Sequence, residues 1–160
     1  MNHRNLSALL ISLCFFPPLL AQNPKKSTPE ERQQWADTLH KLEAQPEDAA
    51  TLKLAQHALE RLIEVDDVTI SPCAFKELPD NYKPFHPVLF YTLGLAAFQV
   101  ETGKNDGLGS NVYALHSVLK AYNTELATNP KAHDKKLDRL AKLDADGQLE
   151  ELIIKDGCNK

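Results

Sequence analysis

The sequence predicts an all-α protein, a compact helical bundle of antiparallel hairpins tied by one disulfide. Apolar residues recur every three or four positions through most of the chain, which is the spacing of one helical face. Residues that favour helix starts precede these runs. With 160 residues, 42% of them hydrophobic and 25% charged, the chain has the composition of a single folded domain. We expect five main helices and one or two short ones within residues 29–160.

The first 21 residues have the layout of a secretory signal peptide. Arg4 supplies a positive charge, residues 6–20 carry no charge, and the small Ala21 ends the apolar run. The Pro17-Pro18 pair leaves any helix here too short to span a membrane, which disfavours the alternative of an N-terminal anchor. We therefore predict cleavage after Ala21, export to the periplasm or out of the cell, and no stable membrane insertion afterwards.

Two cysteines remain after this cleavage, Cys73 and Cys158. In an exported chain such a pair favours a disulfide. This bridge would close a loop of about 85 residues, worth at most ~4–5 kcal/mol of chain entropy. The alternative is a reactive Cys73, placed by Ser71 and Pro72 in the first turn of a helix where its pKa would fall. No second cysteine forms a C-x-x-C arrangement with it and no histidine is near it in the sequence, so we favour the bridge.

Residues 22–28 read as a flexible polar leader, and the first helical hairpin follows it. Thr28 caps the first helix, with Pro29 at its first position and Glu31 completing a capping box. The buried face of this helix is predicted to hold Trp35, Leu39 and Leu42. After the Gln45-Pro46 interruption, the buried face of the second helix is predicted to hold Leu52, Ala55, Leu59, Leu62 and Ile63.

Residues 66–86 lose the helical pattern, apart from a short helix that Ser71-Pro72 could start and Pro79 would stop. A third helix, from Pro87 to about Thr102, carries no charge between Val88 and Val100. Apolar side chains all round a helix indicate that it is central in the bundle. Gly94 lowers helix propensity, so we expect it to admit a close neighbouring helix.

The C-terminal third is predicted to hold three more helices. Ser110 or Asn111 caps the first of them. Its apolar face is formed by Val112, Leu115, Leu119, Tyr122 and Leu126. Asn129-Pro130 ends this helix and starts the next, in which Leu137, Leu140 and Leu143 point inward. A last short helix, at about 148–155, leads to Cys158.

Charge and motifs exclude several functions. The net charge of −4 and pI near 5.8 disfavour a nucleic-acid partner, which needs a basic face. The sequence shows no catalytic motif, so we predict neither an enzyme nor a bound cofactor or metal. His57, Glu60 and Glu64 share one helical face and could form a weak metal site, but such a trio is usually a solvated surface.

Aromatic residues cluster between positions 75 and 91, where five of the nine in the cleaved chain lie. A long irregular segment is often functional, and aromatic side chains on a proline-stiffened loop lose little entropy on binding. The predicted contact residues are Phe75, Tyr82, Phe85, His86 and Tyr91. The alternative is that Phe75, Phe85 and Phe90 plug the core beneath the loop.

Residues 87–130 resemble a tetratricopeptide-repeat hairpin. The likeness rests on the pattern Phe90-x-x-Leu93-Gly94-x-x-Ala97-Phe98 and on a second amphipathic helix that ends at Asn129-Pro130. The resemblance implies antiparallel helix pairs and the binding of a protein or peptide, without catalysis. We therefore predict an exported, non-catalytic protein- or peptide-binding domain. The alternative is an inhibitor or immunity-type protein that neutralises a secreted or periplasmic enzyme.

Overall fold

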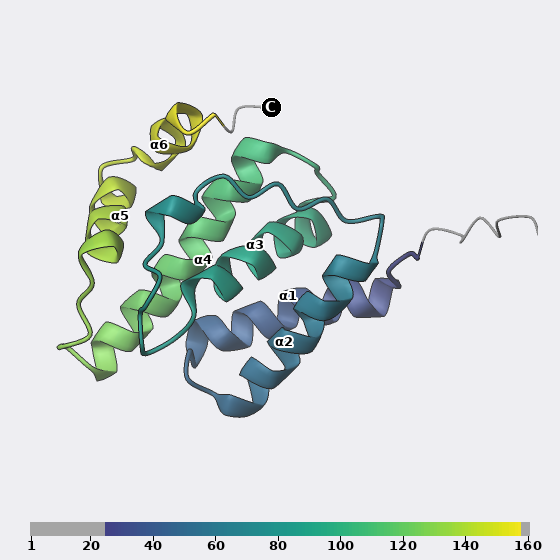
Figure 1. The fold of residues 1–160 in the computed structure, drawn as a ribbon, viewed down its shortest axis with the longest axis horizontal. Coiled ribbons are helices and arrows are strands. Elements are labelled where there is room, and N and C mark those ends of the chain that lie inside the picture. The colour runs from purple at the N-terminus through teal and green to yellow at the C-terminus, as the bar shows by residue number, and fades with distance from the viewer. Residues whose placement is uncertain (1–24, 158–160) are drawn as a thin grey trace, which may run out of the picture.

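The computed structural model describes residues 25–157, and within them the chain forms helices and no strand. This confirms the all-α prediction, whereas the predicted signal peptide lies outside the described residues. Five helices have 11 to 22 residues and one has seven. The elements are α1 (Pro29–Ala44), α2 (Ala49–Glu64), the 3-10 helix η1 (Phe75–Glu77), α3 (Pro87–Thr102), α4 (Gly107–Thr128), α5 (Lys135–Ala145) and α6 (Leu149–Lys155) (Figure 1).

Helix α3 is the centre of the bundle, as its uncharged sequence predicts. It packs against α1, α2 and α4, and most of its residues are buried. A Cβ atom on Gly94 would lie 2.7 Å from the Cα atom of Ala114 in α4. No real Cβ contact is that short, so Gly94 allows the two helices their close approach, as predicted. Gly103, in the left-handed conformation with φ of 66°, ends α3.

The first helix is capped as predicted. The Thr28 hydroxyl accepts a hydrogen bond from the Glu31 amide at 3.1 Å, and the Glu31 carboxylate accepts one from the Thr28 amide at 2.7 Å. Asp48 caps α2 by accepting from the Thr51 amide at 2.8 Å. The predicted core face of α1, with Trp35 as its largest side chain, is buried.

The predicted buried face of α2 is wrong at its C-terminal end. Ala55 and Leu62 are buried, but Leu52 and Leu59 are only half-buried and Ile63 is 86% exposed. The physical reason is that α2 lies at the edge of the bundle, where its main neighbours among the described helices are α1 and α3. Its neighbours cover one stripe of apolar residues and leave the adjacent stripe open.

Helix α4 begins earlier than predicted, because Asp106 rather than Ser110 or Asn111 caps it. The Asp106 carboxylate accepts hydrogen bonds from the amides of Leu108 and Gly109, each at 3.2 Å. Asn111 is fully buried, and its side-chain amide donates to the Ser71 carbonyl at 3.1 Å. This asparagine therefore ties α4 to the connection between α2 and η1.

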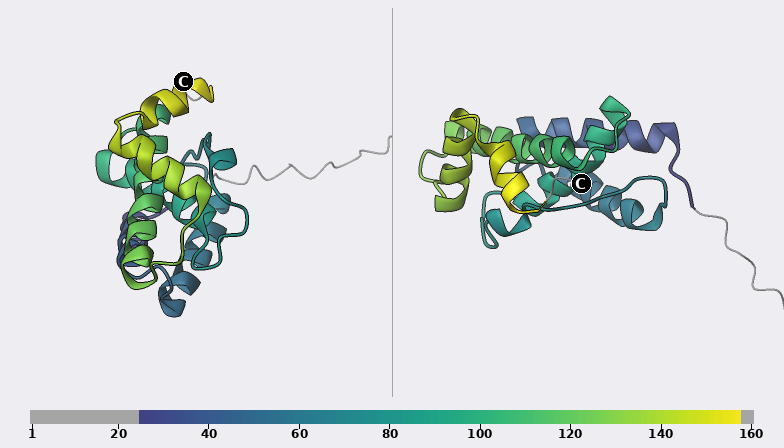
Figure 2. Two further views of the ribbon diagram at one scale, coloured as in Figure 1. Left: turned by 90° about the vertical axis from the view of Figure 1, so that its left-hand side faces the viewer. Right: turned by 90° about the horizontal axis from the view of Figure 1, so that it is seen from above.

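Helices α5 and α6 pack along one side of α4 (Figures 1 and 2). Asp134 caps α5, so this helix starts five residues after Pro130 rather than at it. Leu137 and Leu140 are buried as predicted, and Leu143 is half-buried. In Figure 2, α1 lies toward one face of the molecule, and α2 and the connection to η1 lie toward the other.

Candidate functional site

Three of the five predicted contact residues lie in the core. Tyr82, Phe85 and Tyr91 are 8%, 2% and 0% exposed. The Phe85 ring packs between Tyr82, at a centroid distance of 5.0 Å, and Phe90, at 4.7 Å. The Tyr82 hydroxyl donates to the Ala132 carbonyl at 2.8 Å, which ties the loop to the segment before α5. A partner cannot reach these side chains. The core-plug alternative holds for Phe85 and Phe90, which are buried, but not for Phe75, which is exposed.

Tyr91 determines the path of the loop beside it. Its hydroxyl accepts hydrogen bonds from the backbone amides of Cys73, at 3.3 Å, and Ala74, at 3.0 Å, and donates to the Asn111 side-chain oxygen. Burial raises the pKa of Tyr91, so the hydroxyl keeps the proton that it donates. These bonds satisfy two backbone amides that the irregular segment leaves unpaired.

Only Phe75 and His86 of the predicted contact residues are exposed. Phe75 is 39% exposed, and its ring packs edge-on against Tyr91 at a centroid distance of 5.2 Å. His86 precedes α3 and makes no side-chain capping bond to it. A single half-covered ring and a histidine form a much smaller surface than the cluster that the sequence predicts.

The predicted disulfide involves a residue that the structure does not describe. Cys73 is half-buried, and Cys158 lies outside the described residues. The end of α6 nevertheless lies beside η1, because Lys76 Nζ is 2.6 Å from the buried carboxylate of Asp156. These two residues are three positions after Cys73 and two before Cys158 along the chain.

The trio considered as a weak metal site is divided between other contacts. Glu64 binds Lys25 and Arg61, while Glu60 reaches only His57, at 3.3 Å. In the part of the chain that the structure describes, no group of three or more His, Cys, Asp and Glu side chains is arranged to hold a metal ion. His57 and Glu60 are exposed to solvent, and Glu64 pairs with neighbouring cations.

An apolar groove lies between α2, the connection that follows it and α3. Its volume is about 440 Å³, and no lining residue is charged. Ile63 and Leu59 form the α2 side, Ile70 and Pro72 the connection, and Thr92 the α3 side. We call this site the α2 groove, defined by Leu59, Leu62, Ile63, Val68, Ile70, Pro72 and Thr92. The half-exposed Val88, one helical turn before Thr92, extends its apolar surface along α3.

Hydrogen bonds hold the wall of the α2 groove that the connection forms. The Thr69 amide donates to the Gln99 side-chain oxygen at 3.3 Å, and the Gln99 side-chain amide donates back to the Thr69 carbonyl. The bonds of Asn111 to Ser71 and of Tyr91 to Cys73 hold the next residues along. The groove is therefore a preformed feature of the fold.

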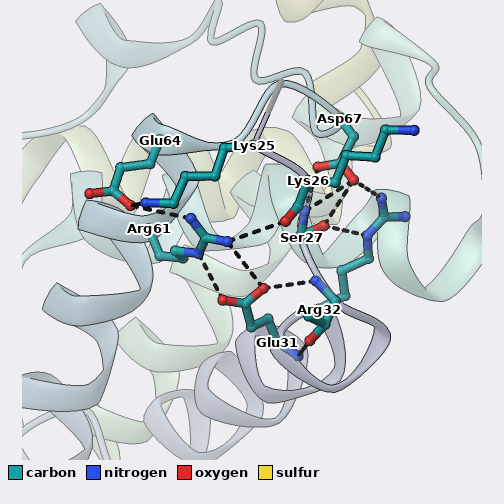
Figure 3. Close-up of polar contacts among 9 residues, drawn as sticks. Lys25, Lys26, Ser27, Glu31, Arg32, Arg61, Glu64 and Asp67 are labelled. Atoms are coloured by element: carbon teal, nitrogen blue, oxygen red, sulfur yellow. Dashed lines mark hydrogen bonds and ion pairs between the residues drawn. The ribbon is translucent and has the colours of Figure 1, made fainter. Parts of the chain in front are cut away.

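The N-terminal residues 25–28, predicted to be part of a flexible leader, are bound to the end of α2. The Ser27 amide donates to the Asp67 carboxylate at 3.0 Å, and Arg32 Nη2 lies 2.8 Å from the same carboxylate. The Lys25 amide donates to the Asp66 carboxylate at 3.2 Å, and the Asp66 amide donates to the Lys25 carbonyl at 3.1 Å. The leader residues therefore lie against the start of the connection that follows α2 (Figure 3).

Arg61 joins this segment to both helices of the first hairpin. Its guanidinium contacts Glu31 at 2.7 Å, Glu64 at 3.2 Å and the Lys26 carbonyl at 3.2 Å, while Lys25 pairs with Glu64 (Figure 3). The hydrogen bond from Arg61 lowers the pKa of Glu31, and Lys25 and Arg61 lower that of Glu64. We call this network the N-terminal clamp, formed by Lys25, Lys26, Ser27, Glu31, Arg32, Arg61, Glu64, Asp66 and Asp67.

A second polar cluster joins α1 to α3 and α4 on the other side of the bundle. His40 lies between two carboxylates, with Nδ1 3.0 Å from Glu43 and Nε2 2.6 Å from Glu101. Lys120 also reaches Glu43, at 3.3 Å, and the Tyr113 hydroxyl donates to Glu101 at 2.7 Å. Partial burial lowers the pKa of His40, but the two carboxylates outweigh it and the net pKa is raised.

Sequence reasoning missed the α2 groove because it assigned one buried face to α2. The residues of α2 form two adjacent apolar stripes, one with Ala55 and Leu62, the other with Leu59 and Ile63. Two stripes make an apolar face wider than the contacts with α1 and α3 cover. That width is the signal in the sequence that could have indicated an open surface.

Among residues 25–157, no helix is both long enough and apolar enough to cross a membrane. Comparison with family models, with curated proteins and with solved structures finds no match to this chain. The resemblance of residues 87–130 to a tetratricopeptide-repeat hairpin therefore stays a prediction.

Proposed function

We propose that this chain is an exported, non-catalytic domain that binds an apolar segment of a protein or peptide in the α2 groove. The observation that carries this proposal is the exposure of Ile63, 86%, beside a groove without charged lining residues. When a partner covers an exposed apolar side chain, the complex is stabilised by about 25 cal/mol for each Å² of apolar surface that is buried. Concave apolar surfaces are the usual places for such partners.

The groove's chemistry supports binding over catalysis. Its lining contains one hydroxyl, on Thr92, and no carboxylate, imidazole, thiol or amine. General acid–base or nucleophilic catalysis needs such a group within hydrogen-bond reach of the substrate. A surface of aliphatic side chains offers only burial, which holds a partner without changing it chemically.

The rigidity of the groove wall supports specific binding. The connection is held at Thr69 by Gln99, at Ser71 by Asn111 and at Cys73 by Tyr91. A partner that enters the groove does not have to order this wall, so less of its contact free energy is lost to entropy. An enzyme neutralised by this domain, as in the inhibitor alternative, would be one such partner.

Export and a Cys73–Cys158 disulfide complete the proposal. The ion pair between Lys76 and Asp156 supports the bridge because it brings the end of α6 to η1. The test is the intact mass of the protein exported by a bacterial host, alkylated without reductant. We expect a chain that lacks residues 1–21, is two hydrogens short and takes up no alkylating reagent. An uncleaved chain with alkylated thiols would overturn this part.

Peptide selection tests the binding function. A phage library of random 16-residue peptides is selected on the mature protein, and the binders are compared on two variants of α2. Ile63→Ser removes the exposed groove side chain, whereas Leu54→Ser removes another exposed α2 side chain, 43% exposed, that lies outside the groove. We expect apolar peptides that lose binding to Ile63→Ser and keep it to Leu54→Ser. Equal binding to both variants, or no enrichment, would overturn the function.

A further inference from the structure

We infer that the occupant of the α2 groove is a basic amphipathic segment, whose apolar side chains enter the groove while a lysine or arginine faces Glu60. This inference rests on the proposed function and names the chemistry of its partner. It follows from which charges at this end of the molecule are already paired and which are left over.

The N-terminal clamp pairs most of the cations at this end. Lys25 and Arg61 share Glu64, Arg61 also holds Glu31, and Arg32 holds Asp67 (Figure 3). Lys26 extends away from Arg61 and Glu64 in the same view. The paired groups largely cancel one another's fields, so they contribute little attraction for a charged partner.

Two carboxylates next to groove residues in the sequence, Glu60 beside Leu59 and Asp66 two positions before Val68, are left without a cation among the described residues. The Glu60 side chain is 75% exposed, and its one polar contact is the exposed His57 at 3.3 Å. The Asp66 carboxylate is reached by the backbone amide of Lys25, which carries no charge. Because the groove itself has no charged lining residue, these carboxylates set the electrostatic character of its edge.

The position of Glu60 fixes where the partner's cation lies. Glu60 is three residues before Ile63, hence one helical turn away on the outer side of α2. A partner that places an apolar side chain on Ile63 therefore needs its cation about one turn from that side chain. Exposed ion pairs add little affinity but strongly favour one partner over another.

The same charges disfavour two other occupants of an apolar groove. A second copy that presented its own α2 face would bring its Glu60 toward like charges. A fatty acid would bring a carboxylate to the same edge. In both arrangements a carboxylate faces another carboxylate, and the repulsion replaces the attraction that a lysine or arginine would have there.

Charge reversal tests the inference on peptides from the library described above, whose composition is not biased toward basic residues. Glu60→Lys reverses the charge at the groove edge. Asp37→Lys makes the same change at an exposed position of α1 outside the groove. We expect the selected peptides to be rich in lysine or arginine beside apolar residues. Their Kd, measured by fluorescence anisotropy, should rise about five- to tenfold for Glu60→Lys and stay within about twofold for Asp37→Lys.

The outcomes separate the inference from the proposed function. Neutral or acidic peptides that lose binding to Ile63→Ser but bind Glu60→Lys as well as the unchanged protein would overturn the inference and keep the function. Self-association of the protein that Ile63→Ser abolishes would also overturn it, because the occupant is then a second copy. Peptides that tolerate both Ile63→Ser and Glu60→Lys would overturn the function itself.

Discussion

Residues 75–91 and the last turns of α2 differ in how far their apolar side chains are buried. Between positions 75 and 91 every aromatic ring except that of Phe75 turns inward, and Phe85 and Tyr91 are almost completely buried although they lie in or beside a long loop. In α2 the regular helix leaves Ile63 in water. Regular structure and burial are therefore separate properties, and the number of neighbouring elements decides which side chains are covered.

The neighbours explain both cases. The loop before α3 lies over the centre of the bundle. There its Tyr82 ring packs against Tyr122 and its Phe85 ring packs against Phe90. Helix α2 lies at the edge and packs against two helices, α1 and α3. An edge helix with two apolar stripes keeps one of them open, and in this fold that stripe forms the α2 groove.

The largest effect is expected where an aromatic ring of the loop is removed. Phe85→Ala should lower the free energy of unfolding by about 3–5 kcal/mol, because the ring is 2% exposed and its loss leaves a cavity between Tyr82 and Phe90. Urea denaturation followed by circular dichroism measures this loss. A change below about 1 kcal/mol would show that the ring is not a core residue.

A smaller loss is expected where the two central helices meet. Gly94→Ala should cost about 1–3 kcal/mol, since the added methyl group would lie 2.7 Å from the Ala114 backbone and push α3 from α4. Alanine favours helices over glycine by about 1 kcal/mol, so a stabilised variant would contradict this close contact. Thermal unfolding of the two proteins side by side gives the sign.

Stability should also depend on pH through His40. Its pKa is raised in the folded protein by Glu43 and Glu101, so its contribution is fully present below the unfolded pKa of about 6.5. That contribution is lost as the pH rises through the folded pKa. Between pH 6 and 8, the unfolding free energy of the unchanged protein should therefore fall relative to that of His40→Gln. Parallel curves for the two proteins would contradict the double carboxylate contact.

The smallest effect on stability is expected at the groove. Ile63→Ser should change the unfolding free energy by no more than about 0.5 kcal/mol, because the side chain is already 86% exposed. Leu54→Ser, at 43% exposure on the same helix, is the matched control and should cost more. If Ile63→Ser were the more destabilising of the two, the side chain would be a packing residue rather than an open surface.

Local signals in the sequence predicted most of the helices. The capping box at Thr28, the uncharged run that becomes α3 and the special position of Gly94 depend on neighbours in the chain or on the strict needs of a packed helix. The N-terminus of α4 was missed because aspartate and asparagine are both good caps. Asp106 caps the helix, whereas the Asn111 side chain donates a hydrogen bond to the carbonyl of Ser71, 40 residues away in the sequence.

The candidate site could not be predicted in the same way. Whether Ile63 is covered depends on which helices lie beside α2, and whether Phe85 is covered depends on Phe90 of α3 and on Tyr82, which itself packs against Tyr122 of α4. Both depend on how the elements are assembled around these residues. The clustering of aromatic residues drew the prediction to residues 75–91, whereas the open surface consists of aliphatic side chains.

The most direct test of the account is a methyl NMR titration of the folded protein with a selected peptide. The account predicts that the methyl signals of Ile63 and Ile70 shift together as the peptide saturates the α2 groove, while those of Leu54, on the other side of α2, stay in place. Shifts centred on the residues around Phe75 and His86, with Ile63 unchanged, would contradict the account and return the binding site to the aromatic loop.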